Sequence, residues 1–181
     1  MDIRQAARQA SAASKRLAAV PSETKNQAIT DIAIALERHG GDVAAANQSD
    51  LKRAAQDRLS APLLKRLKFD EGKIKEACAG LHSLARLADP VGMTLRATEI
   101  DQQLDLYQVT CPIGVIGVIF ESRPDALVQI SSLCLKSGNA VLLKGGSEAA
   151  ETNRILARII SDATRQAGIP ENWLTLLETR S

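Results

Sequence analysis

The stretch Ile113-Gly-Val-Ile-Gly-Val-Ile-Phe120 decides the fold class. It is short, β-branched and apolar on both faces, which is typical of a buried parallel strand. A helical pattern follows at Asp125 to Lys136, a second buried strand at Ala140 to Lys144, a long helix at Glu148 to Ala167 and a third strand at Trp173 to Leu177. This order predicts a βαβαβ unit, and therefore an α/β fold with a parallel sheet and right-handed crossovers.

The predicted sheet is small, and its third strand would be an unprotected edge. The chain ends shortly after that strand, at Ser181. We therefore expect a helix or further strands to follow, so that the 181 residues form an incomplete domain.

The first ninety residues are predicted to be mainly helical. Ser22 is expected to cap an amphipathic helix that ends at Gly40-Gly41, and a second helix is expected from Asp70 to Ala88, ended by Asp89-Pro90. Apolar residues alternate in part between residues 94 and 111, which predicts two extended segments.

Bulk composition excludes several classes of protein. A net charge of +2 gives no reason to expect a nucleic-acid partner, and the longest apolar run is far shorter than the roughly twenty residues of a membrane span. The N-terminus does not resemble a signal peptide. The three cysteines have no CxxC spacing, so we expect no disulfide framework, no metal site and a cytoplasmic protein.

Two loops follow the first two predicted strands: Glu121-Ser122-Arg123-Pro124 and Lys144-Gly145-Gly146-Ser147. The carboxyl ends of parallel strands are where such sheets bind ligands, and both loops lead into helix N-termini that favour anions. Arg123 and Lys144 add positive charge, and the glycines allow close approach of the backbone. Together these features predict a phosphate-bearing ligand. Each residue also has a structural explanation, since Lys144 could cap a strand, Gly145-Gly146 could form a turn and Arg123 could pair with Glu121.

Two long motifs resemble the signature of the gamma-glutamyl phosphate reductase (glutamate-5-semialdehyde dehydrogenase) family, within the aldehyde dehydrogenase superfamily. They are Cys111-Pro-Ile-Gly-Val-Ile-Gly-Val-Ile-Phe-Glu-Ser-Arg-Pro124 and Lys136-Ser-Gly-Asn-Ala-Val-Leu-Leu-Lys-Gly-Gly-Ser-Glu148. Shorter matches extend the resemblance over nearly the whole chain: Thr24-Lys25-Asn26, Ala46-Asn47 with Asp50, Asp57-Arg58-Leu59 and Asp89-Pro90-Val91-Gly92. The chain departs from the family at Asp125-Ala126-Leu127, where Asn-Val-Thr is frequent, and at Phe120, where tyrosine is common.

The resemblance implies an aldehyde-dehydrogenase-like fold, with N-terminal helices followed by an incomplete Rossmann-like parallel sheet. It implies a helical region of the cofactor domain at residues 1–90, a possible oligomerisation arm at 91–111 and the βαβαβ part of the NADPH-binding domain at 112–181, with the catalytic domain absent. It also implies a homo-oligomer and a functional association with glutamate 5-kinase. No kinase-like segment precedes the matching region, so we expect a stand-alone enzyme.

The resemblance also implies roles for the two loops. Phe120, Glu121 and Ser122 would lie on the nicotinamide side, and Glu121 to Pro124 would form the substrate loop. Lys144 would approach the adenosine ribose, with Gly145, Gly146 and Ser147 beside it. Relatives that prefer NAD often have a glutamate at the position of Ser147, and a carboxylate there would repel a 2′-phosphate. The resemblance therefore implies NADPH as the cofactor.

The implied reaction is the NADPH-dependent reduction of L-glutamyl 5-phosphate to L-glutamate 5-semialdehyde and phosphate in proline biosynthesis, through a cysteine thioester. The resemblance places that cysteine beyond residue 181. Cys78 and Cys134 are expected to be buried and inert, and Cys111 stands where the family varies. We take these cysteines, His39 and His82 as structural, and expect the fragment alone to be inactive.

Two alternatives stay open. Another oxidoreductase of the superfamily is possible, although the ESRP and KGGS loops argue against it. The other alternative is a non-catalytic nucleotide-binding or assembly subunit. The reading frame beyond Ser181 would distinguish them, because a continuing chain with a cysteine-bearing loop supports the enzyme.

Overall fold

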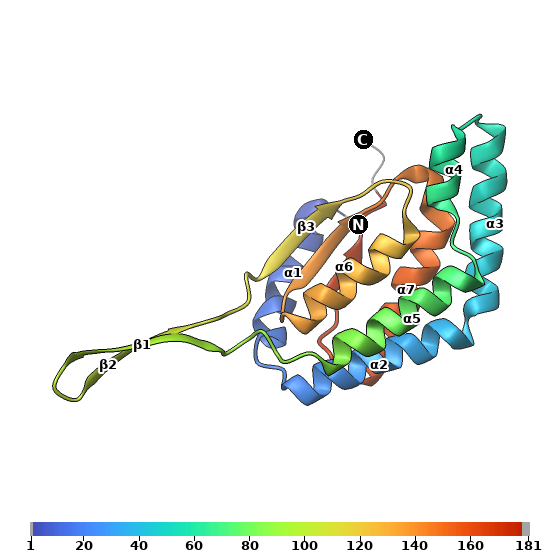
Figure 1. Ribbon diagram of the computed structural model, residues 1–181. Coiled ribbons are helices and arrows are strands. Elements are labelled where there is room, and N and C mark those ends of the chain that lie inside the picture. The colour runs from blue at the N-terminus through green and yellow to red at the C-terminus, as the bar shows by residue number, and fades with distance from the viewer. Residues whose placement is uncertain (1, 179–181) are drawn as a thin grey trace.

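The structure is a computed structural model that describes residues 2–178, so that residue 1 and residues 179–181 lie outside the described part. It consists of a helix-covered sheet and a long hairpin arm that projects from it (Figure 1). The helices are α1 (Ile3–Leu17), α2 (Ser22–Arg38), α3 (Gly40–Gln56), α4 (Ala61–Leu67), α5 (Glu71–Arg86), α6 (Pro124–Lys136), the 3₁₀ turn η1 (Ser147–Ala149) and α7 (Ala150–Gln166). The strands are β1 (Thr94–Asp101), β2 (Leu104–Val109), β3 (Val115–Ile119), β4 (Ala140–Lys144) and β5 (Leu174–Leu176).

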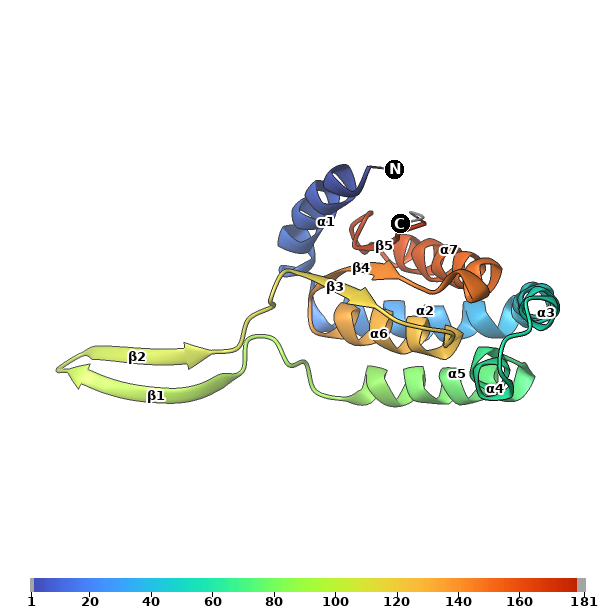
Figure 2. The same cartoon turned by 90° about the horizontal axis from the view of Figure 1, so that it is seen from above.

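The central sheet is parallel, with the strand order β3-β4-β5. Helices α6 and α7 connect its strands, which confirms the predicted βαβαβ unit. Helix α1 packs on one face of the sheet, whereas α6 and α7 lie on the other face and are covered in turn by α2 and α5 (Figure 2). Helix α3 packs against η1 and α7, and so stands beside the end of the sheet to which β4 points.

The prediction that Ile113 to Phe120 is buried was wrong. Strand β3 is the outer strand of the order and has only β4 as a neighbour among the described residues. Ile113 is 83% exposed and Ile119 is 86% exposed, whereas Val141 and Leu143 of the central strand β4 are fully buried. An apolar run indicates a strand but does not tell which strand occupies the centre of the sheet.

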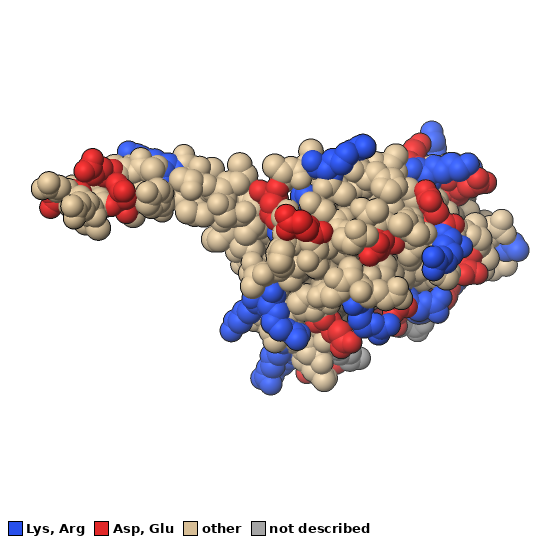
Figure 3. All heavy atoms as spheres, turned by 90° about the horizontal axis from the view of Figure 1, so that it is seen from below, with Lys and Arg blue, Asp and Glu red and all other residues tan. Residues whose placement is uncertain are grey.

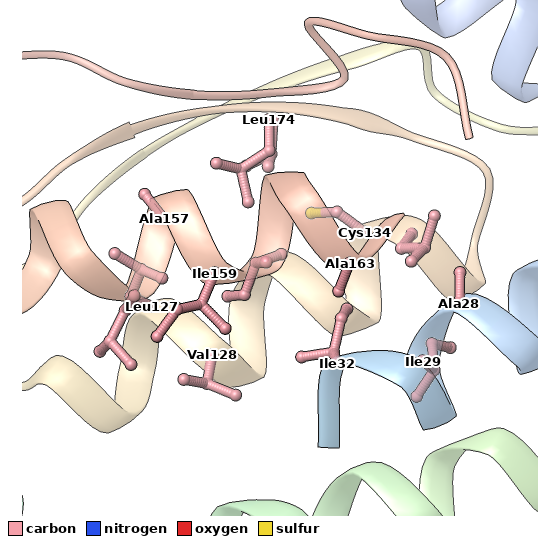
Figure 4. Close-up of a cluster of buried hydrophobic side chains, with 14 of the residues drawn as sticks. Ala28, Ile29, Ile32, Leu127, Val128, Cys134, Ala157, Ile159, Ala163 and Leu174 are labelled. Atoms are coloured by element: carbon pink, nitrogen blue, oxygen red, sulfur yellow. The ribbon is translucent and has the colours of Figure 1, made fainter. Parts of the chain in front are cut away.

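The main hydrophobic core lies between the helices that cover one face of the sheet. Ile29 and Ile32 of α2, Leu127 of α6 and Ile159 of α7 belong to one buried cluster, and Leu174 of β5 lies on its sheet side (Figure 4). These side chains are almost completely buried. Small and branched aliphatic residues dominate the core, as expected for a chain with 2% aromatic residues.

Two predicted helix boundaries differ from the structure. Ser22 is already the first residue of α2 and does not cap it, since Pro21 precedes it in an extended conformation and no side chain caps this end. Proline suits this position because its fixed φ leads into a helix. Gly40-Gly41 do follow the end of α2, but they begin α3 rather than a loop. No helix among residues 2–178 is long and apolar enough to cross a membrane.

The arm is the antiparallel hairpin of β1 and β2, which pairs Thr94 with Val109 at its base. The two extended segments predicted between residues 94 and 111 are thus confirmed. Almost every residue of the hairpin is exposed, including the apolar side chains of Leu95, Leu106 and Tyr107. Figure 3 shows that the arm extends well beyond the body and carries acidic side chains towards its tip.

Candidate functional site

A cleft of about 1170 Å³ opens at the carboxyl ends of the three parallel strands. The loops after β3 and β4, the first turns of α7 and the end of β5 line it, with α3 along one side. The structure therefore brings the two predicted loops together at the edge where parallel sheets bind ligands. Six of the predicted site residues line this cleft: Glu121, Ser122, Lys144, Gly145, Gly146 and Ser147.

Glu148 joins the two loops. Its Oε1 atom accepts hydrogen bonds from the Ser122 amide at 2.8 Å and from the Ser122 hydroxyl at 2.6 Å. Burial by itself would raise the pKa of Glu148, but the hydrogen bonds from Ser122 and the nearby Lys144 together lower it below its ordinary value. Glu148 is therefore ionised at neutral pH and fixes the loop after β3 to the loop after β4.

Ser122 has an unusual backbone conformation, with a φ of +26°, and only 4% of its surface is exposed. Residues other than glycine rarely adopt positive φ, and such strain persists where the surroundings hold it in place. The two hydrogen bonds to Glu148 are what hold Ser122 here.

The two glycines are needed for space. A Cβ atom on Gly146 would lie 2.1 Å from Oε1 of Glu148, so the glycine allows the carboxylate to fold back towards Ser122. A Cβ atom on Gly145 would lie 2.3 Å from the side-chain nitrogen Nδ2 of Asn153. Neither requirement comes from a special φ, since Gly146 has an ordinary φ of −67°. Gly145-Gly146 is therefore built around two polar side chains and is more than a tight turn.

Lys144 ends β4, where it pairs in register with Ile119 of β3. Its ammonium group is partly buried, and its one hydrogen bond within residues 2–178 goes to the Gly145 carbonyl at 3.4 Å. This contact is long, and no carboxylate of the described residues forms an ion pair with Lys144. The ammonium is thus available to an anionic ligand in the cleft.

The N-terminus of α7 does not offer the free amides that the sequence suggested. Asp50 of α3, fully buried, accepts hydrogen bonds from the amide of Thr152 at 2.8 Å and from its hydroxyl at 2.7 Å, and from the amide of Glu151 at 3.3 Å. A carboxylate at this end already satisfies the helix dipole. The amides of Glu151 and Thr152 are therefore not free for a ligand, because a residue distant in sequence occupies them.

Arg123 does not share the cleft with Lys144. Its guanidinium forms an ion pair with Asp125 at 3.0 Å, not with Glu121, and it lines a separate hollow of about 390 Å³ between α5 and α6, together with Lys73. Pro124 is buried as the first residue of α6. Phe120 is partly buried, and its Cζ atom would lie 3.2 Å from a Cβ atom placed on Gly145.

The three cysteines differ in exposure. Cys78 and Cys134 are buried, as predicted, and burial raises the pKa of both thiols, that of Cys134 to about 11. Cys111 is exposed and precedes β3. Buried thiols with raised pKa values are poor nucleophiles, so neither Cys78 nor Cys134 can act as one at neutral pH.

Sequence reasoning missed two polar residues of the cleft, Glu148 and Asn153. In the sequence, Glu148 stands at the end of a motif and at the start of a predicted helix, and a glutamate two residues after a glycine pair is the signal for a carboxylate folded over the loop. Asn153 lies in the first turns of α7, and its helical position gave no signal of a role in the cleft.

Comparison with known proteins fits this architecture. The family model described as "Aldehyde dehydrogenase family" matches residues 1–181. The chain belongs to the aldehyde dehydrogenase family. Two crystal structures described as gamma-glutamyl phosphate reductase superpose closely on it. The structure from Saccharomyces cerevisiae has a TM-score of 0.94 with 40% identity over 98% of this chain and 46% of that one. The structure from Thermotoga maritima has a TM-score of 0.96 with 31% identity over 100% of this chain and 44% of that one.

Curated relatives in the aldehyde dehydrogenase family are also similar in sequence. A protein named gamma-glutamyl phosphate reductase from Pelotomaculum thermopropionicum is 61% identical over 181 residues, and another of that name from Methanosarcina mazei is 47% identical over 184 residues. The matches cover 100% and 99% of this chain, but only 42% and 41% of those proteins. The chain thus spans less than half the length of the relatives it matches.

Proposed function

We propose that this chain is the cofactor-binding part of an NADPH-dependent gamma-glutamyl phosphate reductase, which reduces L-glutamyl 5-phosphate to L-glutamate 5-semialdehyde and phosphate in proline biosynthesis. The observation that carries the proposal is the cleft at the strand ends, where Lys144 lies beside an exposed Ser147. The similar proteins named gamma-glutamyl phosphate reductase supply the substrate. As a biosynthetic enzyme of this kind, the protein would act in the cytoplasm.

The residues of the cleft fit the adenosine end of NADPH. Lys144 offers a cation without a carboxylate partner among the described residues, and Gly145-Gly146 lets a ligand approach the backbone. Ser147 adds no negative charge. The neighbouring Glu148 does carry one, and its Oε1 accepts two hydrogen bonds from Ser122. In the proposal, a 2′-phosphate meets the positive charge of Lys144, and position 147 adds no carboxylate that would repel it.

The other loop would face the reacting end. NADPH supplies the hydride for the reduction. In the proposal, Phe120, Glu121 and Ser122 position the nicotinamide side, and Glu121 to Pro124 form the substrate loop. Arg123, exposed in the hollow between α5 and α6, would attract the anionic substrate. In the proposal, the nucleophilic thiol belongs to a catalytic domain outside residues 1–181, since Cys78 and Cys134 are buried and the exposed Cys111 does not line the cleft.

We assign residues 1–90 to the helical region of the cofactor domain, residues 91–111 to an oligomerisation arm and residues 112–181 to the βαβαβ part. The arm supports this division, since its strands expose Leu95, Ile100, Leu104, Leu106 and Tyr107 to solvent. Another subunit of a homo-oligomer would cover such apolar residues. Functional association with glutamate 5-kinase would supply the acyl phosphate directly.

Calorimetric titration of the purified chain with NADPH tests the cofactor assignment. We expect saturable binding that adenosine 2′,5′-bisphosphate displaces. Failure of the chain to bind any nicotinamide dinucleotide would contradict the proposal. A parallel assay with L-glutamate 5-semialdehyde, phosphate and NADP should show no turnover, because the thiol is missing; robust turnover would mean that Cys111 had been misjudged.

A further inference from the structure

Asn153 is buried in the wall of the cleft, and its side-chain carbonyl has no hydrogen-bond donor among the described residues. Only 2% of its surface is exposed, and its Oδ1 atom accepts no hydrogen bond from any group of residues 2–178. Buried side-chain carbonyls in folded proteins almost always have a donor, so an orphaned one calls for an explanation. Asn153 lines the same cleft as Lys144.

The chain makes room for this carboxamide. Gly145 is the residue whose missing side chain leaves space for it, since a Cβ atom there would lie 2.3 Å from Nδ2 and 3.3 Å from Cγ of Asn153. Any other residue at position 145 would displace the amide or the loop. The amide is therefore placed against the backbone of the loop that carries Lys144, at the junction of β4 and α7.

Another buried asparagine shows what a structural role looks like in this protein. Asn47 of α3 donates to the Leu67 carbonyl at 2.9 Å and accepts from the Phe69 amide at 2.8 Å, so both ends of its carboxamide are satisfied. It is 3% exposed, much like Asn153. The two asparagines are similarly buried. They differ because Asn47 forms hydrogen bonds within the described residues through both ends of its carboxamide, whereas Oδ1 of Asn153 accepts none there.

We propose that the Asn153 carboxamide binds a ribose hydroxyl at the adenosine end of the dinucleotide, beside the phosphate held by Lys144. A carboxamide both donates and accepts, as a hydroxyl does, and its terminal torsion turns easily. Unlike a carboxylate, it can bind a hydroxyl without repelling an adjacent 2′-phosphate. This inference rests on the proposed function and names one more residue of that site.

The test compares Asn153→Leu with Asn47→Leu in the purified chain, measuring the melting temperature and the dissociation constant for NADPH. We expect Asn153→Leu to melt at or above the temperature of the unsubstituted chain and to bind NADPH at least fivefold more weakly. Asn47→Leu should melt lower, because it leaves the Phe69 amide unsatisfied. Asn153→Asp should weaken NADPH more than NADH.

Three results would overturn the inference. If Asn153→Leu melts lower, as Asn47→Leu does, and binds NADPH with unchanged affinity, then Asn153 is structural. If the unsubstituted chain binds NADPH and Asn153→Leu binds it equally well, the ribose contact is wrong while the proposed function stands. If the unsubstituted chain binds neither NADPH, NADH nor adenosine 2′,5′-bisphosphate, the proposed function fails and this inference fails with it.

Discussion

Glu148 and Ser122 are joined by two hydrogen bonds to one carboxylate oxygen, 2.8 Å from the amide and 2.6 Å from the hydroxyl. The two residues belong to different loops and meet above the ends of β3 and β4. This contact fixes the Glu148 carboxylate against Ser122, whose φ is positive, while Lys144 lies near enough to help lower the pKa of Glu148. The shape of the cleft therefore depends on a carboxylate that connects the two loops.

Replacing Glu148 by glutamine should loosen this connection. Glutamine keeps an acceptor but loses the charge, so we expect the free energy of unfolding to fall by about 1 kcal/mol in urea titrations. Gly146→Ala should produce a similar loss, because its methyl group would displace the carboxylate while its φ of −67° suits alanine. Gly41→Ala, where a Cβ atom meets nothing within 4 Å, is the matched control and should cause no loss. Full stability of both Glu148→Gln and Gly146→Ala would contradict this role.

The contribution of Glu148 should depend on pH. Its pKa is lower in the folded chain than the ordinary value of 4.5, so the stabilisation is complete above about that pH and is lost as the pH falls through the folded value. The difference in unfolding free energy between the unsubstituted chain and Glu148→Gln should therefore be constant from pH 7 to 5 and shrink below pH 4.5. A difference that persists unchanged at pH 3 would show that the charge is not involved.

Asp89 should be important for stability because it neutralises a buried lysine. Its carboxylate lies 2.6 Å from the ammonium of Lys25, whose side chain is 3% exposed. A second buried lysine, Lys136, donates hydrogen bonds of 2.6 Å each to the side-chain oxygen of Asn26 and to the Leu87 carbonyl. Asp89→Asn should lower the free energy of unfolding by about 3 kcal/mol, since it leaves a buried charge unpaired. Glu71→Gln breaks an exposed pair with Lys75 and should change nothing measurable. Equal effects of the two substitutions would refute the distinction.

Thiol reactivity should separate the cysteines. In the folded chain at pH 8 we expect one thiol, Cys111, to react rapidly with a disulfide reagent, and all three to react in denaturant. Burial protects Cys78 and Cys134, and it raises the pKa of Cys134 to about 11, so little thiolate forms. Loss of the rapid phase in Cys111→Ser would identify the residue. Rapid modification of a second thiol in the folded chain would show that the core is more open than the structure indicates.

Local patterns were sufficient to predict much of the fold. Strand β4 and helix α6 were placed correctly because a short apolar run and a helical repeat are determined by neighbouring residues. The position of β3 at the edge was not predictable, since strand order depends on contacts distant in sequence. The same limit applies to the site. Lys144 and Gly145 could be predicted from their loop. The contact of Asp50 with α7 could not, because the two partners are about a hundred positions apart in the sequence. The unpartnered Oδ1 of Asn153 could not be predicted either, because its burial depends on the whole fold.

We propose that the loop from Lys144 to Ser147 selects NADPH over NADH. The decisive measurement is the binding of both dinucleotides to Ser147→Glu, with Ser147→Ala as the control. A glutamate at this exposed position would place a carboxylate beside the 2′-phosphate. We predict that Ser147→Glu binds NADPH at least tenfold more weakly while its affinity for NADH changes little, and that Ser147→Ala has a small effect on both. An equal loss of affinity for the two dinucleotides, or no loss for either, would show that this loop does not select NADPH.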